Sequence, residues 1–175
     1  HIVQKLIKAE HSVLVYDNLS TGFQNAIPAE IEFVKGDVRD LEKLKETFHN
    51  FKPDAVIHLA AKLSVPESII KPLEYYDNNT NGLITLLKAC SEFGVNKFIF
   101  SSTAAVYGNS DKSGLYSEKS RLAPLNPYGF SKMFAEQILL DTEATSGIKS
   151  VILRYFNVSG AAIDGSNGQR TQDSS

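Results

Sequence analysis

The feature that most constrains the fold is a repeated alternation between short apolar runs and longer segments of helical periodicity. The apolar runs are rich in β-branched and aromatic residues, as strands are, and they cover residues 12–16, 31–34, 55–59, 97–101 and 150–155. Helical periodicity marks residues 41–50, 75–93 and 127–145. Each of these segments is long enough to cross between parallel strands. The alternation therefore predicts an α/β fold with a doubly wound parallel sheet, a Rossmann-type nucleotide-binding domain.

The most apolar runs indicate which strands are central. Residues 13–15 and 98–100 are continuously apolar, as expected for strands that are covered on both faces. Ligands of such sheets bind outside the carboxyl ends of the strands. The predicted strand ends carry small or polar residues, which include Asp17, Asp37 and Thr103. We therefore expect the functional site along this edge of the sheet.

Charge and composition exclude several classes of function. Of the 175 residues, 18 are Lys or Arg and 20 are Asp or Glu, so the net charge is -2, and their scattered order argues against nucleic acid binding. The sequence contains no apolar run near the roughly 20 residues that cross a bilayer. Cys90 is the single cysteine, which excludes an internal disulfide, fits a reducing cytoplasmic setting and is expected to be buried. The four histidines lack metal-ligand spacing, so no metal site is predicted.

Two acidic residues suggest the cofactor. An acid at the end of the second strand of a dinucleotide-binding domain accepts hydrogen bonds from the adenosine ribose and repels a 2′-phosphate. Asp17 takes this place if one strand and a glycine turn precede His1, and it then favours NAD over NADP. Asp37 follows the next apolar run and is placed to reach the adenine. A simple turn explains either residue equally well.

The glycine-rich turn that normally binds the pyrophosphate is not found among the 11 glycines. We expect it to precede His1, so that residues 1–159 form a Rossmann domain without its first strand and glycine turn. Residues 160–175 are polar, glycine-rich and aperiodic. They are predicted to form a loop that leads toward a substrate domain outside this chain.

Tyr128 and Lys132 form the strongest chemical pattern. They are four residues apart at the start of a predicted helix, so both side chains lie on one face, one turn apart. A tyrosine has a pKa near ~10, and a nearby ammonium together with a nicotinamide cation favours its phenolate. The pair alone is a weak signal, because such spacing is common on helices. The hydroxyl-bearing strand end at Thr103 strengthens it.

Longer motifs then make the sequence recognisable. Residues 103–108 (Thr-Ala-Ala-Val-Tyr-Gly), 127–132 (Pro-Tyr-Gly-Phe-Ser-Lys) and 153–157 (Leu-Arg-Tyr-Phe-Asn) closely resemble the extended branch of the short-chain dehydrogenase/reductase superfamily, the NAD-dependent epimerases and dehydratases of nucleotide sugars. Residues 16–20, 58–61, 66–68 and 72–79 resemble the same family, so the likeness covers nearly the whole chain.

The resemblance implies a role for individual positions. Thr103, Tyr128 and Lys132 become the catalytic residues, and Thr103, Tyr128 and Asn157 contact the substrate. The NAD-binding residues implied by the family pattern are Asp17, Asn18, Leu19, Ser20, Thr21, Gly22, Asp37, Val38, Leu59, Ala60, Ala61, Lys62, Asn78, Ser101, Tyr128, Lys132 and Phe156. Some family members carry a lysine near Leu63, whereas this chain has Lys62 one place earlier.

The resemblance also implies an isomerase reaction, the interconversion of UDP-glucose and UDP-galactose. Tyr128 takes the proton of the sugar 4-hydroxyl, Thr103 hydrogen-bonds that oxygen, and a hydride passes from C4 to NAD. The 4-keto sugar turns over and recovers the hydride on its other face. Family members often pair through helices of this domain, so a homodimer is expected.

Three alternatives remain open. Family dehydratases place an acidic pair directly after the catalytic Thr to eliminate water, whereas this chain has Ala104 and Ala105, so a 4,6-dehydratase is disfavoured. A UDP-glucuronate 4-epimerase stays open because the residues that recognise sugar C6 would lie mostly beyond Ser175. A non-catalytic dinucleotide sensor is disfavoured because a sensor does not need Thr103, Tyr128 and Lys132 together.

Overall fold

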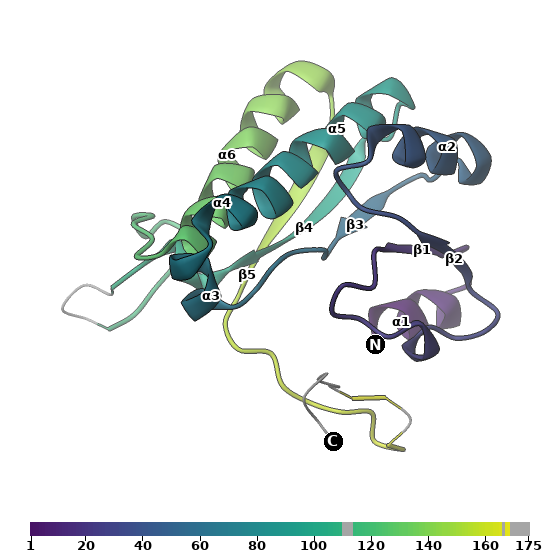
Figure 1. The fold of residues 1–175 in the computed structure, drawn as a ribbon, viewed down its shortest axis with the longest axis horizontal. Helices are drawn as coiled ribbons and strands as arrows, with labels where there is room; N and C mark the ends of the chain where they lie inside the picture. Colours follow the sequence, from purple (N-terminus) through teal and green to yellow (C-terminus); the bar gives the residue numbers. More distant parts are fainter. Residues whose placement is uncertain (110–113, 166, 169–175) are drawn as a thin grey trace. The chain divides into compact units, whose positions relative to one another are not determined.

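The computed structural model describes residues 1–109, 114–165 and 167–168 and is drawn in Figure 1. The chain divides into two compact units. The first comprises residues 1–37 and 157–175, and the second comprises residues 38–156. Part of the loop predicted for residues 160–175 lies outside the described residues, at 166 and 169–175.

The first unit contains a short parallel sheet. Its elements are helix α1 (Ile2–Lys8), strand β1 (Leu14–Asp17), the 3-10 turn η1 (Gln24–Ala26) and strand β2 (Glu32–Lys35). Strand β1 pairs with β2 so that Asp17 lies opposite Lys35. Gly36 permits the Tyr16 ring to pass, because a Cβ at this position would lie 2.3 Å from the Tyr16 hydroxyl. That hydroxyl donates to the Asp37 carbonyl at 2.9 Å, which ties the ends of the two strands together.

The second unit contains a longer parallel sheet of order β3-β4-β5. Its strands are β3 (Val56–His58), β4 (Lys97–Thr103) and β5 (Lys149–Tyr155). Its helices and turns are α2 (Leu41–Phe51), α3 (Val65–Ile70), α4 (Pro72–Tyr75), the π-helical turn η2 (Tyr76–Asn81), α5 (Gly82–Glu92), the 3-10 turn η3 (Ala104–Val106) and α6 (Pro127–Ser146).

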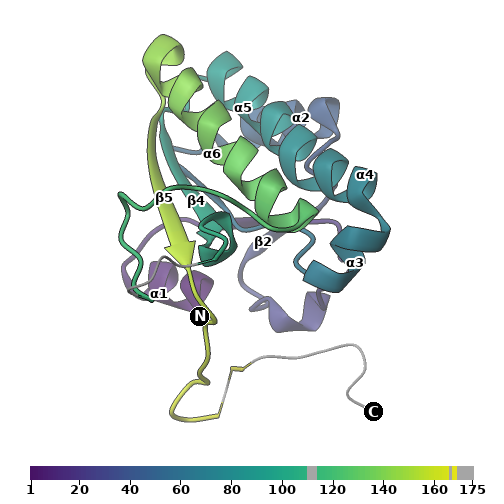
Figure 2. The same ribbon diagram turned by 90° about the vertical axis from the view of Figure 1, so that its left-hand side faces the viewer.

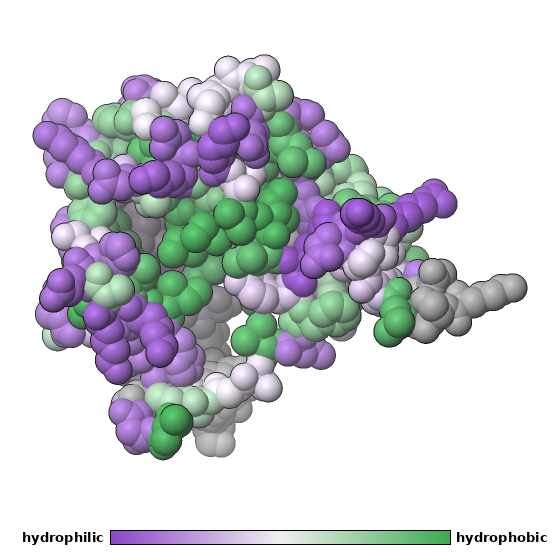
Figure 3. Space-filling model, turned by 180° about the vertical axis from the view of Figure 1, so that it is seen from behind, coloured by the Kyte–Doolittle hydropathy of each residue, from purple (hydrophilic) through white to green (hydrophobic). Residues whose placement is uncertain are grey.

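Helices α2, α5 and α6 cover one face of this sheet, with α5 in the middle (Figures 1 and 2). The core between the layers includes Phe98, Phe100, Leu83 and Leu139, each at most 2% exposed. Residues on the other side of the strands are more exposed. Val151 on β5 is 53% exposed, and apolar residues gather in the middle of the view from behind in Figure 3.

The predicted α/β class with parallel strands is confirmed, with local differences. Strand β4 continues to Thr103, two residues past its predicted end, because Ser102 and Thr103 still pair with β5. The predicted helix over 75–93 is divided between α4, η2 and α5. Helix α2 begins as predicted, since the Asp40 carboxylate accepts from the Lys43 amide at 3.0 Å and caps the helix.

Three single residues of the core are informative, and the predicted burial of Cys90 is confirmed. Cys90 is fully buried and Tyr107 is 5% exposed. His58 is 3% exposed and stacks on the Phe100 ring, with 5.8 Å between the ring centroids. Burial lowers the pKa of His58 to about 3, and the Lys132 charge adds to this. The imidazole is therefore a neutral core group.

Candidate active site

Helix α6 carries Tyr128 and Lys132 in its first two turns. Asn126 precedes the helix, and its side-chain oxygen accepts from the Gly129 amide at 2.9 Å. Pro127 occupies the first helical position, where a missing amide hydrogen costs nothing. The local sequence thus fixes where the helix starts, and the predicted placement of the pair at this start is confirmed.

A close approach of backbones brings this helix start to the end of β4. A Cβ on Gly129 would lie 2.8 Å from the Ala105 carbonyl oxygen and 3.0 Å from the Pro124 side chain. Glycine is therefore the residue that lets α6 contact turn η3. Thr103 ends β4 and caps η3, because its hydroxyl accepts from the Ala105 amide at 3.1 Å. Thr103 and Tyr128 lie within side-chain hydrogen-bond reach of each other.

The Tyr128 hydroxyl is half-buried beside a second tyrosine. Its ring meets the Tyr75 ring edge-on, with the centroids 6.5 Å apart and the planes at 86°. Burial raises the pKa of Tyr128 above its usual value, and the hydrogen bond with Thr103 lowers it again in part. A further stabilising charge is needed before this phenol can act as a base near neutral pH.

Lys132 is the cation of the site and is only 2% exposed. Its ammonium donates to the Ser101 carbonyl at 2.7 Å and lies 4.8 Å above the centre of the Phe100 ring. Burial lowers the pKa of Lys132 to about 8, and the charge of Glu136 opposes this. The sequence placed this ammonium beside the Tyr128 phenol, whereas the structure directs it to the carbonyl of the neighbouring strand.

Asn79 joins the loop after β3 to α6. This buried amide donates to the Ser131 hydroxyl and to the Lys62 carbonyl, each at 3.0 Å, and accepts from the Lys62 amide at 2.8 Å. Ser131 in turn donates to the Tyr128 carbonyl at 2.7 Å. Asn79 lies in the π-helical turn, a feature often found at functional sites. Sequence reasoning selected its neighbour Asn78 and missed this residue.

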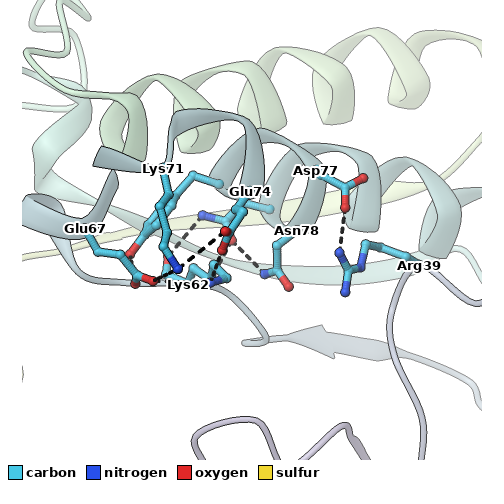
Figure 4. A network of polar contacts seen from close by, with 9 residues as sticks. Arg39, Lys62, Glu67, Lys71, Glu74, Asp77 and Asn78 are labelled. Carbon is cyan, nitrogen blue, oxygen red and sulfur yellow. Dashed lines mark hydrogen bonds and ion pairs between the residues drawn. The ribbon is translucent and has the colours of Figure 1, made fainter. Parts of the chain in front are cut away.

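Lys62, in the loop after β3, belongs to a charged network with residues of α3 and α4 (Figure 4). Its ammonium contacts Glu74 at 2.9 Å and Glu67 at 3.4 Å. Glu67 also accepts from the Tyr75 hydroxyl at 2.9 Å, and burial with this bond raises the pKa of Tyr75 to about 12. The network holds the ring that packs against Tyr128. Tyr75 falls in the segment 72–79 that carries part of the resemblance, but no sequence signal indicated its contact with Tyr128.

The predicted adenosine-side residues lie together in the first unit. The Asp17 carboxylate accepts from the Leu19 amide at 2.7 Å, and the Asn18 side-chain oxygen Oδ1 accepts from the Ser20 amide at 2.9 Å. The Asn18 amide also donates to the Asp37 carboxylate at 3.0 Å. These bonds form a turn at the end of β1, which is the alternative that the sequence left open. The loop ends with Thr21 and Gly22, both exposed.

The other predicted cofactor positions belong to the second unit. Val38 is 9% exposed, Leu59 is 46% exposed and Phe156 is 66% exposed. Ala60, Ala61, Asn78 and Ser101 are half-buried. The predicted substrate contact Asn157 is exposed and belongs to the first unit. The second unit thus gathers Ser101, Thr103, Tyr128 and Lys132 at one strand end.

Together, the parallel α/β fold and a Thr-Tyr-Lys group at the end of a strand define a class of nucleotide-dependent enzymes. The chain matches the model of the NAD dependent epimerase/dehydratase family over residues 1–174. It belongs to this family.

Relatives of the chain carry a more particular name. The UDP-glucose 4-epimerase of Azospirillum brasilense is 46% identical over 171 residues, which are 98% of this chain and 49% of that protein. The crystal structure of UDP-glucose 4-epimerase from Brucella ovis in complex with NAD is 41% identical, with a TM-score of 0.93 over 99% of this chain and 53% of that one. The UDP-Glc/GlcNAc 4-epimerase of Campylobacter jejuni is 43% identical, with a TM-score of 0.84 over 98% of this chain and 54% of that one. The chain spans about half the length of these relatives.

Proposed function

We propose that this chain is the cofactor-binding part of an NAD-dependent enzyme that interconverts UDP-glucose and UDP-galactose. The observation that carries the proposal is the grouping of Thr103, Tyr128 and Lys132 where β4 ends and α6 begins. Family membership and the names of the relatives support the substrate class.

The donors and acceptors of the chain fit a dinucleotide. Asp17 presents a carboxylate at a strand end, which suits ribose hydroxyls. An ammonium has three N–H donors, and the Ser101 carbonyl accepts from one of those of Lys132. When bound, NAD supplies the acceptor and the later donor of a hydride at sugar C4.

The residues of the chain then handle the proton. The Tyr128 phenolate accepts the proton of the sugar 4-hydroxyl, while the Thr103 hydroxyl donates to the same oxygen and orients it. The charge of Lys132 favours the phenolate. Burial strengthens this attraction, because charges interact more strongly where water is excluded. After the sugar has turned over, Tyr128 returns the proton to the 4-oxygen.

The proposal is tested by incubating the complete protein that carries this chain with UDP-galactose and NAD. We expect UDP-glucose to accumulate to an equilibrium that is also reached from the other side. Parallel incubations with UDP-glucuronate and UDP-N-acetylglucosamine separate the related epimerases, and formation of a 4-keto-6-deoxy sugar would indicate a dehydratase. A protein that binds NAD but converts none of these substrates would be a sensor, which contradicts the proposal.

We also propose that the protein forms a homodimer and that it is located in the cytoplasm. Apolar residues on the outer side of α6 support the dimer, since Leu140 is 52% exposed and Phe134 is 43% exposed. In the part of the chain that the structure describes, no helix is long and apolar enough to cross a membrane. Light scattering of the purified complete protein tests the oligomeric state, and a monomer at micromolar concentration would contradict the dimer.

A further inference from the structure

Glu136 is a buried acid that the proposed reaction does not use. It is 2% exposed and lies in the middle of α6. Tyr128, Lys132 and Glu136 follow one another at intervals of four residues, so their side chains share one face of the helix. A buried carboxylate on this face is costly unless it is paired.

The partners of Glu136 come from both neighbouring strands. Arg154 on β5 donates to it through Nη2 at 2.7 Å and through Nε at 3.1 Å to each carboxylate oxygen. Ser102 on β4 donates its hydroxyl to the same carboxylate. Arg154 is itself held by the Tyr107 hydroxyl at 3.2 Å and lies over the Tyr107 ring. The position of the carboxylate is therefore fixed by two strands, β4 and β5.

These contacts connect Glu136 to the candidate active site along two routes. Ser102 lies between Ser101, whose carbonyl accepts from Lys132, and Thr103, which reaches Tyr128. The bond from Ser102 to Glu136 therefore fixes the strand segment that presents both groups. The second route is electrostatic, because the negative charge of Glu136 raises the pKa of Lys132 against the larger effect of burial.

We propose that Glu136 is a positioning residue that keeps Lys132 protonated at neutral pH and holds the end of β4 in register with Tyr128. This inference rests on the proposed function for its catalytic consequence, but its physical content concerns Lys132 and the end of β4. A cation kept in a dry site needs a nearby anion, and Glu136 is the acid that acts on it here.

Several titratable groups surround Lys132. Tyr128 and Glu136 share its helix, His58 on β3 senses its charge, and Arg154 on β5 is paired with Glu136. Tyr75 lies behind Tyr128. His58 is neutral above pH ~3 and Tyr75 is neutral below pH ~12. Neither of these two groups therefore changes charge over the range in which Lys132 titrates.

The test is an NMR titration of the complete protein labelled with ¹³C at lysine Cε. The Lys132 resonance is identified by its loss in Lys132→Met. We expect a midpoint of about 8 for the parent protein and a lower midpoint for Glu136→Gln, which keeps the shape of the side chain but removes its charge. At pH 7 the protonated fraction of Lys132 is about nine-tenths for a midpoint of about 8 and about one half if the midpoint falls by about one unit. Turnover of UDP-galactose at pH 7 should then fall about twofold.

Glu143→Gln is the matched control, since Glu143 lies on the same helix and pairs with the exposed Lys149. It should leave the Lys132 midpoint unchanged. If Glu136→Gln does not fold, Glu136→Leu also removes the charge while Arg154 keeps the Tyr107 hydroxyl and the Glu118 carbonyl as partners, and it should also lower the midpoint. An unchanged midpoint in a folded Glu136 variant would overturn the inference. If the midpoint falls but even the parent protein fails to convert UDP-galactose, only the proposed function fails.

Discussion

Burial shifts the pKa values of Tyr128 and Lys132 in opposite directions. Burial raises the pKa of the phenol and lowers that of the ammonium, because water no longer stabilises either charged form. A phenolate beside an ammonium would compensate both costs. In the proposed mechanism, each of the two groups therefore favours the charged form of the other.

The role of Tyr128 is tested by Tyr128→Phe. This change deletes the proton acceptor and leaves the ring, so we expect kcat for UDP-galactose to fall by about 100-fold to 10,000-fold while NAD stays bound. Tyr76→Phe makes the same chemical change in η2, where the Tyr76 ring packs 6.0 Å from Phe134, and should leave turnover unchanged. Near-normal turnover of Tyr128→Phe would remove Tyr128 from the mechanism.

Gly129→Ala tests the close approach of α6 to the strand end. The added methyl group would contact the Ala105 carbonyl at 2.8 Å, and we expect the free energy of unfolding to fall by about 1–3 kcal/mol. In Gly22→Ala the nearest atom is 3.7 Å away, so this control should be nearly neutral. Denaturant unfolding measures both changes. Equal stability of the two variants would show that the helix tolerates a wider separation.

At the scale of elements, α6 carries most of the site. Its first turns present Tyr128 and Lys132, and its middle presents Glu136 to β4 and β5. The turn η2 is fixed to α6 through Asn79 and through Thr80, whose hydroxyl donates to the Ser131 carbonyl at 3.2 Å. A shift of α6 along its axis would therefore disturb every one of these contacts together.

This dependence predicts different effects for two helix caps. Asn126→Ala and Asp40→Ala each remove a side chain that accepts from a backbone amide at a helix start, and each should cost about 1 kcal/mol of stability. Only Asn126→Ala should also lower kcat, because α6 and not α2 carries the residues proposed to transfer the proton. Equal kcat for the two variants, measured at saturating UDP-galactose, would contradict this assignment.

At the scale of the whole molecule, His58 makes the free energy of unfolding depend on pH in the acid range. Its pKa is lowered to about 3 in the folded protein from 6.5, so between these values the unfolded chain binds more protons. Stability from this group is therefore present above pH ~6.5 and is lost as the pH falls toward 3, by about 1.4 kcal/mol per pH unit.

His58→Phe should reduce this acid loss, since phenylalanine can keep the contact with the Phe100 ring and does not titrate. The exposed His49 on α2 provides the control His49→Gln, which should leave the slope unchanged. Urea unfolding between pH 4 and 7 measures the slope for the parent and both variants. The same slope in His58→Phe and in the parent would assign the acid sensitivity to other groups.

Sequence reasoning predicted the α/β class, the parallel strands and the start of α6, because these depend on local periodicity, capping and apolar content. It also selected Thr103, Tyr128 and Lys132. It missed Tyr75, Asn79 and the pair of Glu136 with Arg154. A signal for Glu136 was present, since a charged residue eight positions after Tyr128 falls on the buried face of the helix. Asn79 ends the segment 72–79 that carries part of the resemblance, but nothing in that segment indicated its buried hydrogen bonds to Lys62 and Ser131.

The sequence by itself determined which residues can carry the chemistry and on which element each of them lies. Local hydrogen bonds and the spacing of apolar residues are sufficient for that. Only the tertiary structure decided that the Lys132 ammonium bonds the Ser101 carbonyl and that Arg154 pairs with Glu136, the acid one turn further along α6. These contacts join residues that are between 18 and 31 positions apart. They form only when packing removes water and brings the strands and α6 together.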